Sequence, residues 1–308
     1  MAMLSCFRGW LWAVPATVLS LSPSLFYAQT ADPTPPSAYR TSAAEVRISF
    51  FATDEANRLV TTVDKNDFAV IDDETIIRDF RSLNRSHETA LDLVLMLDTS
   101  QSIAARFPGM MREVLKLVSS QTPGSEDHLS VIVFGRNRPS LLCSDDCRTS
   151  VAQQRLLSLH PEGPTPLFDA LAFAANFVST RPDTGARRVL LLFSDGDDTF
   201  SGTSALASLD AVIAGGTTLY TIDLGTENSA GSLTLQQMAQ ATGGRAFSLP
   251  RSDTNFLAAI SDDLRASYVV TYQLPSHVAG FHTLCILPKH NLNLHFHCRR
   301  GYVYDNPE

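Results

Sequence analysis

The chain has no excess of positive charge and no cluster of it. Its 24 Lys and Arg residues stand against 32 Asp and Glu residues, which gives a net charge of −8. No basic stripe is present that would neutralise the phosphates of a nucleic acid, so we expect no nucleic-acid partner. The chain also lacks a glycine-rich loop for cradling phosphate, and His160 has no nucleophile elbow or fixed triad spacing to accompany it.

Long apolar runs are absent after the first 28 residues. Arg8 precedes an apolar stretch over residues 10–25, and Ala28 ends a plausible cleavage site. We interpret residues 1–28 as a secretory signal peptide and residues 29–42 as a linker rich in Pro, Ser and Thr. The alternative is an uncleaved membrane anchor, the one case in which we expect membrane attachment. The predicted location is therefore secreted or periplasmic.

Cysteines are few, and their number fits export. Cys6 would leave with the signal peptide, and the four that remain are an even number in an oxidising compartment. The four cysteines can pair in three ways. We favour the scheme of two local disulfides: Cys143 with Cys147, and Cys285 with Cys298 facing each other across a hairpin. A zinc site is the rival for Cys143 and Cys147, but no Cys or His pair lies nearby at zinc spacing.

The middle of the chain alternates strand-like apolar runs with helical stretches. The expected strands are residues 91–97, 129–134, 188–193 and 218–224. The expected helices cover residues 111–118, 168–175, 233–241 and 256–266. Such alternation predicts a doubly wound, mostly parallel α/β sheet with both faces covered, over residues 89–268.

The two ends of the chain have a different pattern. Residues 46–50 and 268–272 alternate between apolar and polar side chains, which is typical of antiparallel strands with one face buried. We therefore predict a small antiparallel β-sandwich built from both chain ends, residues 43–88 and 269–308, with the α/β domain inserted between them. The alternative is that the two ends form separate small units.

Hard oxygen ligands follow the first strand of the α/β domain. Asp98, Ser100 and Ser102 place one carboxylate and two hydroxyls at alternate positions of a loop, and these are ligands that Mg²⁺ prefers. Asp195 ends another strand, and Thr165 lies on a loop just before a helix. Ligands gather at the carboxyl ends of parallel strands where the strand order reverses, so the five side chains predict one metal site with a position left open. Taken alone, each of these residues can also be interpreted as a helix cap or a turn residue.

This order of residues resembles the metal-ion-dependent adhesion site of von Willebrand factor type A domains, which have a Rossmann-like fold. Residues 219–225 resemble the late strand of that family, and residues 235–245 resemble the helix and glycine turn of its bacterial members. Residues 64–73 and 299–302 resemble the opening and closing signatures of a secreted bacterial family that carries such a domain. All five positions of the metal motif are filled in this chain.

The resemblance implies a role for each residue. Ser100 and Ser102 would bind Mg²⁺ (or Mn²⁺ or Ca²⁺) directly, and Thr165 directly or through water. Asp98 and Asp195 would act mainly through bridging waters, which leaves the ion enough charge to attract an acidic ligand. The sixth position would hold water, or a carboxylate from a partner.

The expected function is an exported, non-enzymatic module that recognises an Asp or Glu of a protein partner through the cation; the sequence gives no oligomeric state. The rivals are a structural component of a cell-envelope complex and a metal-dependent hydrolase, for which no general base is evident. We expect Asp197 and Asp198 to be solvated loop charges and Asp92 to pair at the start of its strand. We expect four histidines to lie on an exposed hairpin face: His282, His290, His295 and His297. The alternative is that they bind a second metal.

Overall fold

The computed structural model describes residues 45–85, 90–120, 127–136, 138–145, 147–182, 186–249 and 256–304. The predicted signal peptide and linker lie outside these ranges. Within them, no helix combines the length and the apolar character needed to cross a membrane.

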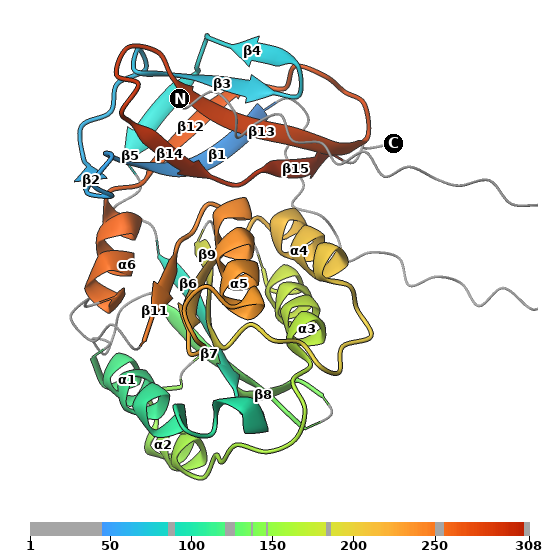
Figure 1. Cartoon of the computed structure of the whole chain (residues 1–308). Coiled ribbons are helices and arrows are strands. Elements are labelled where there is room, and N and C mark those ends of the chain that lie inside the picture. Colours follow the sequence, from blue (N-terminus) through green and yellow to red (C-terminus); the bar gives the residue numbers. More distant parts are fainter. Residues whose placement is uncertain are drawn as a thin grey trace, which may run out of the picture. The chain divides into compact units, whose positions relative to one another are not determined.

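A six-stranded sheet forms the centre of the α/β part of the chain (Figure 1). Its strands are β6 (Leu91–Asp98), β7 (His128–Phe134), β8 (Ser140–Cys143), β9 (Arg187–Ser194), β10 (Thr218–Asp223) and β11 (Ala246–Ser248). The spatial order is β11-β10-β9-β6-β7-β8, and every pair is parallel except β7 with β8. The four predicted strands form β6, β7, β9 and β10, whereas the short edge strands β8 and β11 were not predicted.

Helices cover both faces of this sheet. One hydrophobic cluster joins it to α1 (Phe107–Ser120), α2 (Ser150–Leu157) and α6 (Phe256–Arg265). The other joins it to α3 (Leu167–Ser179), α4 (Ala205–Ala214) and α5 (Ala230–Ala241). Leu95 of β6 faces the first cluster and Met96 the second, and both are completely buried. Burial on both faces explains why β6 is a continuous apolar run, and it confirms the predicted α/β class.

The strand order reverses beside β6. From β6 the chain proceeds to β7 and β8 on one side and then returns to β9 on the other side of β6. The carboxyl ends of β6 and β9 are therefore neighbours at the point where the order switches. In open α/β sheets this crevice is the usual place for a ligand.

Strands from both ends of the chain form two antiparallel sheets. The strands are β1 (Glu45–Thr53), β2 (Leu59–Val60), β3 (Phe68–Asp72), β4 (Thr75–Ile77), β5 (Ser82–Arg85), β12 (Tyr268–Gln273), β13 (Gly280–Pro288), β14 (His295–Cys298) and β15 (Gly301–Tyr304). One sheet has the order β14-β1-β12-β5, with β2 paired to β1, and the other has the order β15-β13-β3-β4. A single hydrophobic cluster contains side chains of both sheets, among them Phe50, Phe68, Tyr272 and Ile286.

The predicted hairpin in which Cys285 faces Cys298 is wrong. Cys285 of β13 lies opposite Ile71 of β3, whereas Cys298 of β14 lies opposite Phe50 of β1 in the other sheet. Although both strands are described, the structure forms no disulfide between the two cysteines. The chain between β13 and β14 crosses from one sheet to the other instead of turning back within one sheet. Alternating side chains look the same in the sequence for both arrangements.

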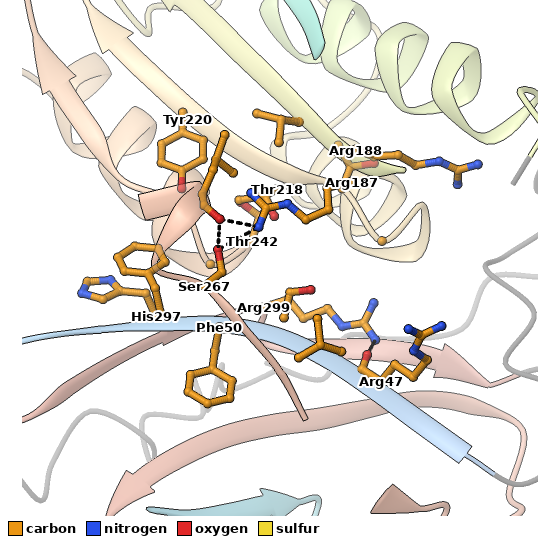
Figure 2. A pocket seen from close by; sticks show the side chains of 18 residues that line it. Arg47, Phe50, Arg187, Arg188, Thr218, Tyr220, Thr242, Ser267, His297 and Arg299 are labelled. Carbon is orange, nitrogen blue, oxygen red and sulfur yellow. Dashed lines mark hydrogen bonds between the residues drawn. The ribbon is translucent and has the colours of Figure 1, made fainter. Parts of the chain in front are cut away.

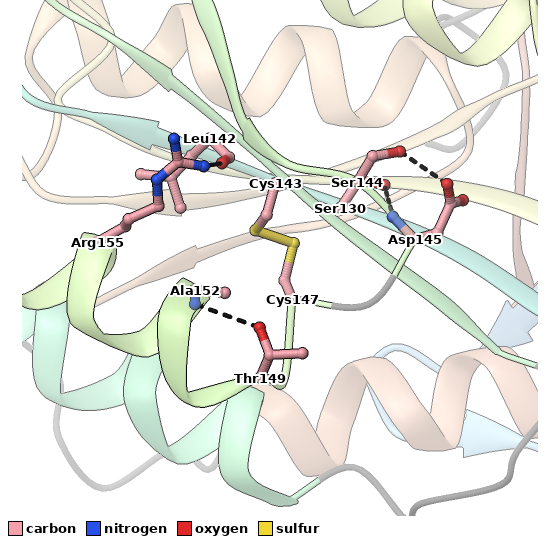
Figure 3. Close-up of a disulfide and its surroundings, with 9 residues drawn as sticks. All are labelled: Ser130, Leu142, Cys143, Ser144, Asp145, Cys147, Thr149, Ala152 and Arg155. Carbon is pink, nitrogen blue, oxygen red and sulfur yellow. Dashed lines mark hydrogen bonds between the residues drawn. A yellow bond between two sulfur atoms is a disulfide. The ribbon is translucent and has the colours of Figure 1, made fainter.

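A disulfide joins Cys143 and Cys147, as Figure 3 shows, with their Cα atoms 5.6 Å apart. It links the end of the edge strand β8 to the segment before α2, and Cys147 is completely buried. Next to it, Thr149 caps α2 by accepting a hydrogen bond of 3.2 Å from the amide of Ala152. Arg155 of α2 donates to the carbonyl of Leu142, at 2.9 Å. Together these contacts hold α2 against β8.

Candidate metal centre

Two loops meet beyond the carboxyl end of β6: the loop that follows β6 and the loop that precedes α3. Their backbones are joined by two hydrogen bonds, from Gln101 N to Gly163 O (3.0 Å) and from Glu162 N to Thr99 O (2.7 Å). Thr99 is also held to β7, because its amide donates to the carbonyl of Phe134. This network places the segment with Ser100 and Ser102 next to the segment with Thr165.

The two serine hydroxyls lie side by side. Ser100 Oγ and Ser102 Oγ share a hydrogen bond of 3.0 Å, and Ser100 is completely buried whereas Ser102 is exposed. Adjacent oxygens around an octahedral Mg²⁺ at its usual bond length are about 2.9 Å apart. The spacing of the two hydroxyls therefore fits two neighbouring ligand positions, with Ser102 on the side that faces solvent.

Asp98 is completely buried and contacts the segment that carries these hydroxyls. Its Oδ1 accepts a hydrogen bond from the amide of Ser100 (2.8 Å), and its Oδ2 accepts one from Ser194 Oγ (2.7 Å). Burial raises the pKa of Asp98 to about 6, and the negative charge of Asp195 adds to the increase. The two carboxyl groups are thus close enough to repel each other, and a divalent cation nearby would favour their charged forms.

The loop after β9 is tied to the loop before α3. Thr199 Oγ1 accepts from the amide of Thr165, and the amide of Thr199 donates to the carbonyl of Thr165, both at 2.9 Å. Asp198 is not the solvated charge that we expected, because its Oδ1 accepts from the amide of Leu167 at 2.8 Å. Pro166, at the N-cap of α3, makes no capping bond with its side chain, so Asp198 replaces that cap. Thr165 itself is buried.

Asp195 directly follows β9, and Asp223 ends the adjacent strand β10. Asp195 is 8% exposed and Asp223 is 5% exposed. Asp223 Oδ1 accepts from the amide of Gly225 (2.7 Å), while the exposed Asp197 donates its amide to Asp195 Oδ1 (3.3 Å). Burial and then the charges of Asp195 and Asp223 raise the pKa of Asp197. Asp223 was not predicted from the sequence, although its position at the end of a buried strand matches that of Asp98.

At the opposite end of the sheet, where the parallel strands start, polar side chains are paired within the protein. Asp92, near the start of β6, pairs with Arg181 at 2.9 Å, as predicted. A cavity of about 180 Å³ lies near the starts of β9 and β10 and is shown in Figure 2. Two arginines that line it are engaged with protein oxygens: Arg187 donates to Leu264 O (2.6 Å) and Ser267 Oγ (2.9 Å), and Arg299 donates to a main-chain carbonyl of β1 (3.1 Å). None of the predicted metal ligands lines this cavity.

Several solved structures are similar to this chain. An aerotolerance-related membrane protein from Bacteroides fragilis is 20% identical, with a TM-score of 0.46 over 57% of this chain and 98% of that one. Proximal thread matrix protein 1 from the mussel byssus is 16% identical, with a TM-score of 0.45 over 63% and 51%. The manganese-loaded TRAP protein of Plasmodium vivax is 15% identical, with a TM-score of 0.45 over 78% and 100%.

Among curated proteins there is no match to this chain. The family model of the von Willebrand factor type A domain matches residues 92–262, more than half of the chain. The matched segment begins in β6 and ends in α6, so it contains the six-stranded sheet and all six α-helices described above. The chain therefore belongs to the von Willebrand factor type A domain family.

Proposed function

We propose that this chain is an exported, non-enzymatic module that binds a protein partner through a divalent cation. Ser100, Ser102 and Thr165 would hold the ion with their hydroxyls, and Asp98 and Asp195 would act through water. The observation that carries the proposal is the pair of serine hydroxyls 3.0 Å apart at the switch point of the sheet. Export rests on the predicted signal peptide, with cleavage near Ala28.

The burial of the site supports an ion with one face open. Asp98 and Ser100 are completely buried and Thr165 nearly so, whereas Ser102 is exposed. A cation held by these hydroxyls would be closed off on the protein side and accessible from the side of Ser102. Hydroxyls carry no charge, so the ion would keep most of its own and would attract a carboxylate. The partner group would be an Asp or Glu side chain.

The oxygen ligands indicate Mg²⁺, with Mn²⁺ or Ca²⁺ as substitutes. The non-enzymatic role is proposed because domains of this family are usually interaction modules. In addition, the buried carboxylates described here already accept hydrogen bonds from the loops of the site. The two antiparallel sheets from the chain ends would form a β-sandwich that serves as a scaffold or as a second contact surface.

The first test is calorimetric titration of Mg²⁺ and Mn²⁺ into the chelator-stripped full chain. We expect one saturable site, and an affinity at least tenfold lower in Ser100→Ala and in Ser102→Ala. Ser179→Ala is the matched control, since Ser179 Oγ only donates to a carbonyl of its own helix. Equal affinity in all four proteins would contradict the proposed ligands.

The second test asks whether the bound ion accepts a carboxylate. Water relaxation at the Mn²⁺-loaded chain should fall when a glutamate-containing peptide is added in excess, and should not change with the matching glutamine peptide. If chelation lowers the melting temperature while neither peptide affects relaxation, the metal has the structural role of the rival hypothesis.

A further inference from the structure

A second group of possible metal ligands lies in the antiparallel sheets, outside the centre at β6. Asp72 ends β3, Asp73 follows it in the turn to β4, and His282 lies on the neighbouring strand β13. One ligand atom from each residue can be chosen so that all three lie within 4.8 Å of one another. His282 Nδ1 is 2.9 Å from Asp73 Oδ2 and 3.9 Å from Asp72 Oδ1.

The ring of His282 is held in one orientation. Its Nε2 lies 2.7 Å from the carbonyl oxygen of Val278, and because a carbonyl can only accept, Nε2 carries the proton. The ring is buried and stacks on Tyr302 with the centroids 5.0 Å apart. In the neutral imidazole, Nδ1 therefore presents its lone pair to the two carboxylates. Nδ1 is close to Asp73 Oδ2 but is not aligned for a hydrogen bond with it.

Asp72 is held in the same manner. Its Oδ2 accepts hydrogen bonds from the hydroxyls of Tyr272 (2.7 Å) and Tyr302 (3.0 Å). Its Oδ1 faces His282 and has no hydrogen-bond partner, although Asp72 is only 1% exposed. A buried carboxylate oxygen without a partner is costly, so this atom requires a positive or protonated neighbour.

Asp73 completes the group from the solvent side. Its Oδ1 accepts from the amide and the hydroxyl of Thr283, at 2.7 and 3.0 Å, and its Oδ2 is left for His282. The side chain of Asp73 is 44% exposed, which gives an ion a path of entry and room for water. Each of the three residues thus has one polar atom tied to the protein and the other directed at a shared point. Metal ligands are oriented in this way by their surroundings.

From this pattern we propose that Asp72 Oδ1, Asp73 Oδ2 and His282 Nδ1 bind a Zn²⁺ ion, with water as a further ligand. An imidazole nitrogen with two carboxylates suits zinc, whereas the oxygen-only centre at β6 suits Mg²⁺. The site is independent of the proposed partner-binding site. The expectation that four histidines share one exposed face is wrong, because His282 is buried in β13 and His297 lies in the other sheet, where it stacks on Phe51.

The test is calorimetric titration of Zn²⁺ into the chelator-stripped full chain at saturating Mg²⁺, which occupies the centre at β6. We expect one Zn²⁺ per chain, unchanged affinity in Asp98→Ala, and at least tenfold weaker binding in Asp73→Asn and His282→Gln. Asp73→Asn is the more informative variant, because Asp73 is exposed and the asparagine oxygen can still accept from Thr283. Circular dichroism confirms that each variant is folded.

A Co²⁺ titration gives a readout of the ligands themselves. Visible d–d absorption should appear in the wild-type chain and in Asp98→Ala, and should be lost in His282→Gln. The proposal is overturned if no Zn²⁺ binds, or if Asp73→Asn and His282→Gln bind it as tightly as the wild type. The cluster would then be an ion pair between a protonated His282 and Asp73.

Discussion

Ser194 Oγ donates a hydrogen bond of 2.7 Å to Asp98 Oδ2 and so joins the ends of β9 and β6. The same hydroxyl accepts from the amide of Gly196, at 3.1 Å. One serine therefore fixes the orientation of the buried carboxylate and the start of the loop that follows β9. The candidate centre depends on this contact between two strands that lie 96 residues apart in the chain.

The raised pKa of Asp98 predicts how stability depends on pH without metal. Its value of about 6 in the folded chain lies above the ordinary value, so the folded state binds the proton more tightly than the unfolded state. The contribution of Asp98 to the free energy of unfolding is therefore largest below about pH 4 and falls as pH rises to about 6, by roughly 2–3 kcal/mol.

Urea unfolding with EDTA at pH 4.5, 5.5 and 7.5 measures this effect. We expect the difference in stability between the wild type and Asp98→Asn to change with pH, and saturating Mg²⁺ to reduce that change because the ion favours the carboxylate. Parallel pH profiles of the two proteins would show that Asp98 does not titrate in this range.

Asp198 links the stability of α3 to metal binding. Asp198→Ala removes the acceptor for the amide of Leu167 and should lower the free energy of unfolding by about 1–2 kcal/mol. Because the loop of Asp198 also holds Thr165, Mg²⁺ affinity should fall as well. Asp198→Asn keeps an acceptor oxygen and should retain most of both properties. Calorimetry gives both quantities, and a stable Asp198→Ala with unchanged affinity would refute the link.

Gly196 is required by the backbone of the loop after β9. Its φ is +79°, and a Cβ atom there would lie 2.2 Å from the carbonyl oxygen of Gly231 in α5. Gly196→Ala should therefore cost at least about 2 kcal/mol of stability or displace the loop with Asp195. Gly202→Ala is the matched control, because a Cβ at Gly202 would meet no atom within 4 Å. Similar melting temperatures of the two variants would contradict this argument.

The disulfide between Cys143 and Cys147 should stabilise the chain without affecting the candidate centre. It closes a short loop, for which the chain-entropy model gives about 2 kcal/mol. Dithiothreitol should lower the melting temperature of the wild type and leave that of a Cys143→Ala/Cys147→Ala double variant unchanged. Mg²⁺ affinity should be the same before and after reduction, because β8 lies two strands away from β6. A loss of affinity on reduction would show that the edge strand positions the centre.

Local signals in the sequence predicted much of the α/β part. Four apolar runs became β6, β7, β9 and β10, since a strand buried on both faces needs apolar side chains at successive positions. The short edge strands β8 and β11 gave no such signal. Asp98, Ser100 and Ser102 were predicted as ligands because they come at the end of a buried strand and directly after it. Their position relative to that strand can be read from the sequence alone.

Some residues whose role depends on distant segments were not predicted. Asp198 caps a helix that begins 31 residues earlier in the chain, so nothing near it in the sequence marks it as a cap. Asp72 and His282 lie 210 residues apart and meet only because β3 pairs with β13. The hairpin expected between Cys285 and Cys298 was wrong for the same reason, since spacing along the chain does not show which sheet a strand joins.

The amino-acid sequence by itself determined the α/β class of the middle segment, the family of the chain and the hydroxyls that follow β6. These depend on periodicity and on short motifs, which are set by neighbouring residues. Only the tertiary structure decided that the loop before α3 is hydrogen-bonded to the loops after β6 and β9, that Cys285 and Cys298 lie in different sheets, and that Asp72, Asp73 and His282 converge. Those arrangements arise from strand pairing and side-chain packing between distant segments, and their free energies depend on contacts that form only in the folded chain.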